Sequence, residues 1–188
     1  MTVRLSLIAP AMNAALREAR FDDSGPVEPV PAGLLTPAAG VRVVSSPSGR
    51  CRATAEALGL GPDVPVAEAL AGCGMGRWRG RRLDEVSAED PAGVGAWLSD
   101  PDAAPHGGES LGALLGRVAG WLEALEPDVA VLAVAEPDVI RAAAVHALGA
   151  PPSAFWRLDV RPLSRTTLSG RSGRWNLRLG EPLGPAAG

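Results

Sequence analysis

The feature that most constrains the fold is an uninterrupted apolar run from Val129 to Val134. A strand that is apolar at every position is buried on both faces, which is typical of the centre of a parallel sheet. Glu136, Pro137 and Asp138 follow at once, and a proline in the first turn favours the start of a helix. A buried strand that leads into a helix is the building unit of layered α/β domains.

The rest of the chain supplies the other elements of such a domain. Strands are predicted at 3–8, 41–44, 156–160, 165–169 and 174–179. Helices are predicted at 14–19, 49–58 and 111–125, the last with Ser110 as its N-cap, and after residue 136. Residues 22–40 are expected to form a loop with at most one helical turn. This order predicts a three-layer α/β domain with a mainly parallel central sheet flanked by helices.

The length favours one domain, which we place at residues 1–180. Within it, residues 59–108 form an irregular insert rich in glycine and proline, with one helix expected near 92–98. Such a long insert forms either a lid or pocket wall or a surface excursion. Residues 181–188 are expected to be a flexible tail.

In sheets of this kind a ligand binds beyond the carboxyl ends of the strands. These ends are Ala9-Pro10, Ser45-Ser46 and Ala135-Glu136. We therefore expect these three loops to converge on one site.

The composition argues against several functional classes. The net charge of -3 is unfavourable for a nucleic-acid or anionic-membrane binder that depends on bulk charge. The arginines between 77 and 82 are balanced by acidic residues at 84–90, which predicts a solvated surface. The N-terminal apolar run is too short for a membrane span and lacks the layout of a signal peptide, so a cytoplasmic location is expected.

No cofactor or metal is expected. Cys51 and Cys73 are too few for a disulfide scaffold or a four-ligand metal site, and no glycine-rich nucleotide loop is present. All 18 basic residues are arginine, which is typical of a GC-rich bacterial genome, so a single arginine carries less functional information than usual.

Four segments, in order along nearly the whole chain, resemble the histidine phosphatase (phosphoglycerate mutase-like) superfamily. SSPSGRCRATAEALGL at 45–60 resembles its "SSP…R…TA…LG" segment, and GRWRG at 76–80 resembles its "G.weG". PHGGESLGALLGRVAGWL at 105–122 resembles its "GES" helix start, and VAVLAVAEPDVIRAAAVHALGAP at 129–151 its second strand-loop-helix. The resemblance implies the fold of that superfamily.

The same resemblance implies that the catalytic groups of the superfamily are replaced. Its "RHG" motif, whose histidine accepts the phosphoryl group, falls on Ala9-Pro10-Ala11, its second histidine on Glu136 and its acidic proton donor on Gly72. Proline forms no phosphohistidine, and glycine protonates no leaving group. Two like charges about 4 Å apart at an effective dielectric near 20 cost on the order of 4 kcal/mol, so Glu136 is expected to disfavour phosphate. Arg50, the retained arginine, is expected to pair with Glu136.

These arguments give two sets of candidate residues. The candidate catalytic residues are Glu136, Glu109 and His106, and the candidate ligand-binding residues are Arg50, Asn13, Pro10 and Trp78. Simpler roles compete with these assignments. Glu136 can serve only the helix dipole, Glu109 only the entry into a helix, and His106 only as a solvated loop histidine.

Three functions remain open at this point. The first is a non-phosphatase, a pseudoenzyme that binds a small ligand or a protein partner in the ancestral pocket. The second is a repurposed enzyme of the lyase, isomerase, cyclase or dehydratase type in a specialised-metabolite pathway, using Glu136 with Arg50. The third, a conventional phosphatase or mutase, is disfavoured because both histidines and the acid are missing. A small-molecule partner is expected, nucleic acid and membrane are not, and a homodimer or protein partner stays open.

Overall fold

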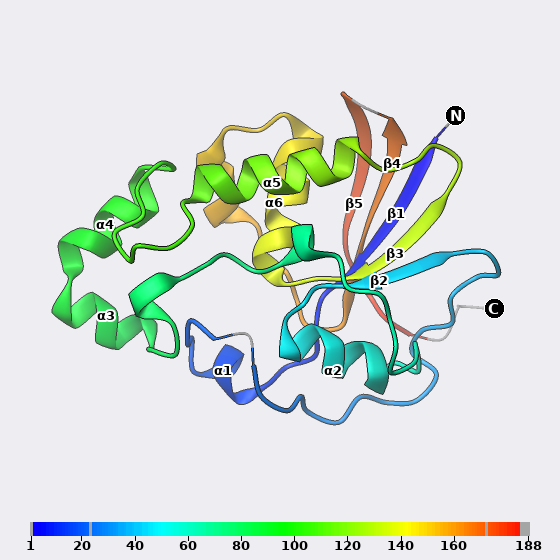
Figure 1. The fold of residues 1–188 in the computed structure, drawn as a ribbon, viewed down its shortest axis with the longest axis horizontal. Coiled ribbons are helices and arrows are strands. Elements are labelled where there is room, and N and C mark those ends of the chain that lie inside the picture. Colours follow the sequence, from blue (N-terminus) through cyan, green and yellow to red (C-terminus); the bar gives the residue numbers. More distant parts are fainter. Residues whose placement is uncertain (1, 23, 172, 185–188) are drawn as a thin grey trace.

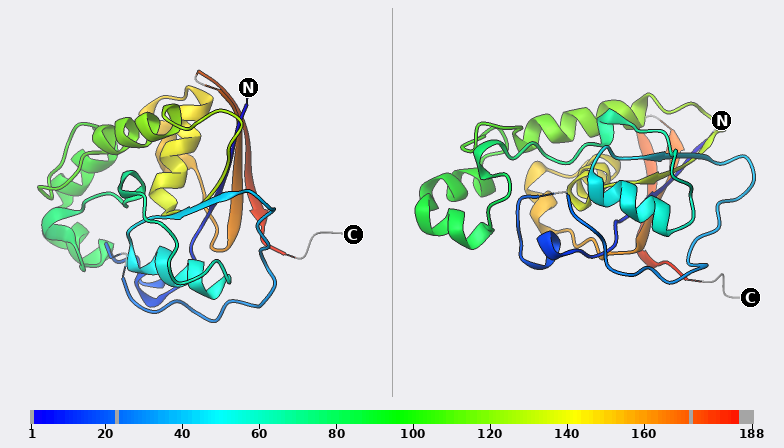
Figure 2. Two further views of the ribbon diagram at one scale, coloured as in Figure 1. Left: turned by 45° about the vertical axis from the view of Figure 1, so that its right-hand side comes forward. Right: turned by 60° about the horizontal axis from the view of Figure 1, so that its bottom comes forward.

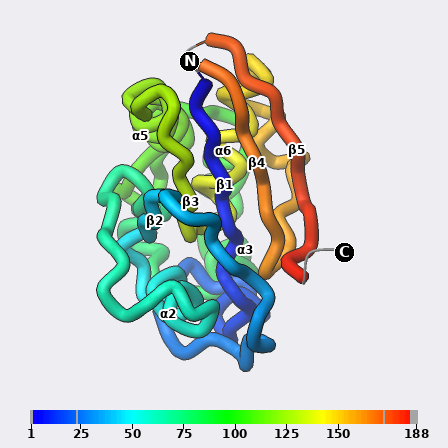
Figure 3. The backbone as a smooth tube through the Cα atoms, turned by 90° about the vertical axis from the view of Figure 1, so that its right-hand side faces the viewer, coloured from blue at the N-terminus to red at the C-terminus, as the bar shows by residue number. Residues whose placement is uncertain are grey.

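The computed structural model describes residues 2–22, 24–171 and 173–184. Their strands form one mixed sheet (Figure 1). Within these residues the strand order is β2-β3-β1-β4-β5 (Figure 3). The strands are β1 (Val3–Ile8), β2 (Arg42–Ser45), β3 (Ala130–Val134), β4 (Ser164–Arg171) and β5 (Arg174–Pro182). Strands β2, β3 and β1 are parallel, whereas β4 and β5 are antiparallel to their neighbours. The predicted α/β class with a parallel sheet centre is confirmed.

Helices cover both faces of the sheet (Figure 2). They are α1 (Ala14–Arg17), α2 (Gly49–Ala57), α3 (Leu83–Glu89), α4 (Pro91–Ser99), α5 (Leu111–Glu123) and α6 (Pro137–Leu148). Because side chains alternate along a strand, Val131 and Ala133 of β3 pack in the core cluster with α5 and α6, whereas Leu132 and Val134 pack in the cluster with α2. Helices α3 and α4 lie at the end of the molecule opposite β5.

Helix α5 confirms the prediction made from its periodicity. The Ser110 hydroxyl accepts a hydrogen bond from the Ala113 amide at 3.1 Å, as an N-cap does. The buried face carries Leu111, Leu114, Val118 and Leu122. No helix among the described residues is long and apolar enough to cross a membrane.

Three predictions of local structure were wrong. The predicted strand at 156–160 is absent, and Pro152–Arg157 is instead a 3₁₀-helix. It follows Pro151, and Pro152 at its start has no amide to offer a sheet and a fixed φ that suits a helical turn. The insert holds two α-helices, α3 and α4, and two short 3₁₀-helices, Glu68–Leu70 and Gly76–Trp78, rather than one helix. Strand β5 extends to Pro182, so the predicted tail begins too early, and its residues 185–188 lie outside the described part of the chain.

Candidate functional site

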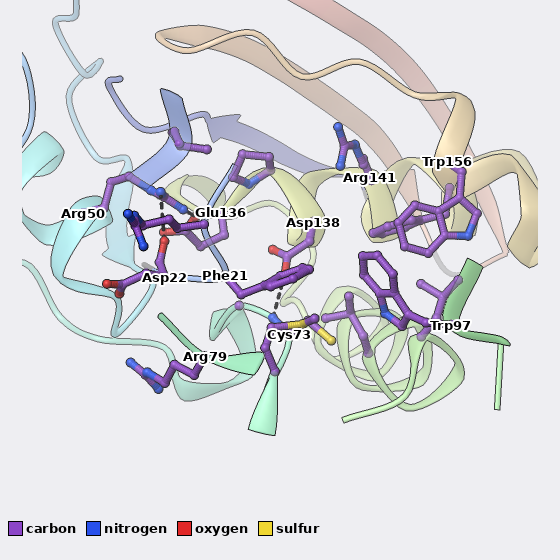
Figure 4. A pocket seen from close by; sticks show the side chains of 18 residues that line it. Phe21, Asp22, Arg50, Cys73, Arg79, Trp97, Glu136, Asp138, Arg141 and Trp156 are labelled. Atoms are coloured by element: carbon purple, nitrogen blue, oxygen red, sulfur yellow. Dashed lines mark hydrogen bonds and ion pairs between the residues drawn. The ribbon is translucent and has the colours of Figure 1, made fainter. Parts of the chain in front are cut away.

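The three predicted loops do converge at the carboxyl edge of the parallel strands. The Ala135 amide donates to the Ile8 carbonyl at 3.0 Å, and the Ser46 amide donates to the Val134 carbonyl at 2.8 Å. A cleft of about 250 Å³ opens beside them. Figure 4 shows charged side chains at one end of this cleft and tryptophans at the other.

At the charged end, Arg50 and Glu136 form a buried ion pair, as predicted. Glu136 also accepts hydrogen bonds at Oε1 from the Ser48 hydroxyl at 2.6 Å and from the Cys51 thiol at 3.3 Å. The other terminal nitrogen of Arg50 donates to Asn13 Oδ1 at 3.3 Å. The pair is therefore part of a closed polar network rather than an open binding site.

Two helix starts create this network. Ser48 is the N-cap of α2, where its hydroxyl accepts from the Cys51 amide at 3.1 Å while donating to Glu136. Arg50 follows in the first turn of α2. Glu136 occupies the N-cap position of α6, but its side chain makes no capping hydrogen bond and reaches to α2 instead. Glu136 therefore joins two helices rather than only facing its own helix dipole.

Asp138, one position after Pro137, lies on the cleft wall. Its carboxylate accepts hydrogen bonds from the Cys73 amide at 2.6 Å and from the Val139 amide at 2.7 Å. Burial, reinforced by the charge of Glu136, raises the pKa of Asp138 to about 6. The sequence pattern indicated Asp138 only as part of a helix start, so its place on the cleft wall was not predicted.

Gly72 faces both carboxylates. A Cβ placed on this glycine would lie 3.4 Å from Glu136 Cγ and 3.6 Å from Asp138 Oδ2. Any larger side chain at position 72 would therefore enter the space in front of these acids. This agrees with the resemblance, which assigned a proton donor to that position.

The other end of the cleft is aromatic. Phe21, Trp97 and Trp156 line it, and each of these rings is only partly buried. The ring centroids of Trp97 and Trp156 are 4.6 Å apart, and those of Phe21 and Trp97 are 5.7 Å apart. Trp97 and Trp156, the latter expected on a strand, form a wall of the pocket.

His106 and Trp78 lie behind the cleft and do not line it. His106 is 1% exposed, so the expectation of a solvated loop histidine was wrong. Its Nδ1 accepts from the Gly108 amide at 3.0 Å, and its ring lies 5.1 Å from that of Trp78. Burial and the nearby charge of Arg77 lower the pKa of His106. Trp78, 1% exposed, packs against Phe21 and Trp97, which line the cleft, and does not line it itself.

Glu109 stabilises the rim of the cleft. Both of its carboxylate oxygens accept from Arg117, at 2.8 and 2.7 Å. Arg117 also donates to the carbonyls of Ala69 and Ala71, at 2.7 and 2.9 Å. Together these two side chains hold the segment that leads into Gly72 and Cys73.

Asn13 and Pro10, the other two candidate residues, are buried structural groups. Asn13 caps α1 through the Leu16 amide at 3.0 Å and donates to the Ser24 carbonyl at 2.8 Å. Pro10 is buried at the end of β1, outside the cleft wall. His146, the second histidine of the chain, contacts Glu123 at 2.6 Å. Among the described residues, no group of three or more histidine, cysteine or acidic side chains is arranged to hold a metal ion.

The fold and part of the sequence match known proteins. The family model of the histidine phosphatase superfamily (branch 1) matches residues 32–181. A putative alpha-ribazole-5'-P phosphatase from Escherichia coli shares the fold, with a TM-score of 0.78 at 22% identity over 99% of this chain and 98% of that one. The mycobacterial glucosyl-3-phosphoglycerate phosphatase Rv2419c, solved in complex with VO3, gives 0.73 at 26% identity over 95% and 98% of the two chains.

A curated relative is the bifunctional protein Rv2228c of Mycobacterium tuberculosis. It is 39% identical over 90 residues, which are 46% of this chain and 25% of that protein. The match thus spans about a quarter of the length of the relative.

Proposed function

The chain belongs to the histidine phosphatase superfamily, and from its cleft we propose that it binds a small molecule without transferring phosphoryl groups. The observation that carries this proposal is the buried Arg50–Glu136 pair. Arg50 is the one arginine of the superfamily pocket retained in the motifs, and here its charge is neutralised by a carboxylate. A phosphate entering this end would lose that cation and meet the Glu136 anion instead.

The available nucleophiles support the same proposal. The positions that the motifs assign to the two catalytic histidines hold Pro10 and Glu136. His106 is packed behind the cleft, and His146 is bound to Glu123. The thiol of Cys73 lines the cleft, but burial raises its pKa to about 12, so little nucleophilic thiolate is present at neutral pH.

A phosphatase assay with a vanadate-binding measurement tests this proposal. Wild type and Arg50→Ala are incubated with p-nitrophenyl phosphate and a panel of sugar and amino-acid phosphates, and vanadate binding is measured by calorimetry. We expect no hydrolysis above that of Arg50→Ala and no vanadate binding. Turnover by wild type that Arg50→Ala abolishes would show a working phosphatase and refute the proposal.

A repurposed proton-transfer enzyme is the second candidate, and Asp138 favours it. A carboxyl group with a pKa of about 6 in a cleft can accept and release a proton near neutral pH. Arg50 is less suited to orient a substrate carboxylate, because both of its terminal nitrogens are engaged within the protein. Incubating a bound ligand in D₂O with wild type, Glu136→Gln and Asp138→Asn separates the two candidates. Exchange of a carbon-bound hydrogen by wild type and its loss in Asp138→Asn would indicate an enzyme.

A further inference from the structure

Most ionic side chains on the cleft wall are engaged within the protein. Arg50 pairs with Glu136, and Arg20 pairs with Glu18 at 2.7 Å. Asp22 and Arg79 also have interactions of their own. These groups offer an incoming ligand little net charge, so the recognition of a charged ligand must come from the remaining two, Asp138 and Arg141.

Asp138 and Arg141 form no ion pair with any described residue. Asp138 receives two backbone amides, as described above. Arg141 donates through Nε to the Leu158 carbonyl at 2.7 Å, and its guanidinium carbon lies 5.8 Å from the centre of the Phe155 ring. A negative and a positive group therefore line the same cleft, and neither forms a salt bridge with a described residue, although the charge of Arg117 also acts on Asp138.

Their spacing on α6 places them side by side. Residues three apart on a helix share a face, with Cβ atoms about 5–6 Å apart. Figure 4 shows Asp138 and Arg141 on this helix, with Phe21, Trp97 and Trp156 beside them. The cleft thus presents a carboxylate, a guanidinium and partly exposed aromatic rings within the reach of one small molecule.

Resting on the proposed binding function, we propose that the ligand is a small aromatic zwitterion, a free aromatic amino acid or a close relative. Asp138 binds its ammonium group, Arg141 binds its carboxylate, and its ring lies against Trp97 and Trp156. A zwitterion supplies a countercharge to both groups, whereas an amine leaves Arg141 unpaired and a simple acid leaves Asp138 unpaired. The aromatic wall offers ring contacts, and the bound ring shields the apolar surface of the wall from water.

The size of the cleft supports a ligand of this class. Its volume of about 250 Å³ lies just below the range of roughly 300–1,000 Å³ common for pockets that hold drug-sized ligands. A single amino acid suits such a volume better than a nucleotide or a peptide. Phosphate esters fit the charges less well, because Asp138 and Glu136 both oppose a dianion.

Calorimetric titration with three matched compounds tests the assignment. L-Tryptophan carries both charges, tryptamine lacks the carboxylate, and indole-3-propionate lacks the ammonium. We expect wild type to bind L-tryptophan about 10- to 100-fold more tightly than either analogue, as for the loss of one charge-assisted contact. Equal affinity for all three, or no binding of L-tryptophan and L-phenylalanine at millimolar concentration, would overturn the proposal.

Two variants assign the charges to residues. Arg141→Met should bind L-tryptophan no better than tryptamine, and Asp138→Asn should bind it no better than indole-3-propionate. Arg157→Met, which removes an exposed arginine outside the cleft, should behave as wild type. If a cleft variant fails to fold, the analogue series on wild type alone still decides. An arginine variant that keeps the full preference for L-tryptophan over tryptamine would refute the role of Arg141.

The outcome is separable from that of the proposed function. Absence of amino-acid binding together with absence of phosphatase activity and vanadate binding rejects only the ligand class. Phosphatase activity or vanadate binding in the cleft rejects the proposed function itself.

Discussion

Arg50 and Glu136 pair at the point where helices α2 and α6 begin, and their side chains are only 6% and 3% exposed. The pair connects the loops that follow β2 and β3 at the carboxyl edge of the sheet. With Ser48, Cys51 and Asn13 it satisfies much of its own hydrogen-bonding capacity. The pair therefore fills the charged end of the cleft with groups that bind one another.

The two members of this pair should not contribute independently to the stability of the fold. Arg50→Met or Glu136→Gln leaves a buried polar or charged group without its partner, and we expect a loss of about 3–5 kcal/mol in the free energy of unfolding. The double variant Arg50→Met/Glu136→Leu should lose clearly less than the sum of the two single losses. Urea unfolding measures all three.

The exposed pair Arg81–Glu89 provides the matched control. Arg81→Met should leave the free energy of unfolding nearly unchanged, because exposed ion pairs contribute little. Single variants at Arg50 and Glu136 that are as mild as Arg81→Met would mean that the buried pair does not hold the two helices together.

Asp138 should make the stability of the protein depend on pH between about 4 and 6. An aspartate in the unfolded chain has a pKa of about 3.9, whereas burial and the Glu136 charge raise that of Asp138 to about 6. Arg117 and the Cys73 amide also face this group and lower the pKa in part. As pH rises through this window the unfolded chain releases its proton first, so ionisation of Asp138 lowers stability.

Comparison with Asp138→Asn isolates this effect. The melting temperature of wild type minus that of the variant should fall by about 2–6 °C between pH 4 and pH 7. Most of the change should occur below about pH 6. A difference that stays constant, or that grows with pH, would show that Asp138 is ionised as easily in the folded protein as in the unfolded chain.

The sheet was predictable from a strong, continuous sequence signal, whereas the ion pair was predicted from the resemblance of the motifs to the superfamily. The apolar run at 129–134 is typical of a buried central strand, and the motifs placed Arg50 and Glu136 in the loops that follow two of the strands. The loops after parallel strands must meet at one edge, so their side chains could be placed together without knowing the rest of the fold.

The aromatic wall was not predictable in the same way. Trp97 and Trp156 come from a nine-residue helix and a 3₁₀-helix, where apolar positions fit a core stripe or a strand equally well. Trp156, Leu158 and Val160 alternate as a strand would, and only the tertiary structure shows that they do not pair. The place of Asp138 in the cleft was not predictable for another reason. Acidic residues are common in the first turn of any helix, so the residue type alone does not indicate a site.

Arg117 should control the accessibility of Cys73 through the rim of the cleft. Arg117→Lys keeps the positive charge but loses the two-pronged contact with Glu109 and one or both carbonyl contacts. We expect the Cys73 thiol to react slowly with a maleimide in wild type, because its pKa is about 12 and it is partly buried. In Arg117→Lys the reaction should be about 10-fold faster, as the segment opens more often.

Mass spectrometry of the labelled peptides separates the two cysteines. Cys51 is buried and should stay unlabelled in both proteins. Equal labelling rates of Cys73 in wild type and Arg117→Lys would show that Arg117 does not hold the segment at 69–74 closed.

Gly108 and Gly116 should respond in opposite directions to the same substitution. A Cβ at Gly108 would lie 1.8 Å from the Gly74 carbonyl oxygen, in a backbone contact that no side-chain movement relieves. Gly108→Ala should therefore cost more than about 2 kcal/mol by separating the two segments of the rim. Gly116 is exposed on α5 with no atom within 4 Å of the added methyl, so Gly116→Ala should stabilise by about 0.5–1 kcal/mol. Urea unfolding of both variants measures the contrast, and a harmless Gly108→Ala would mean that residues 74 and 108 are not in contact.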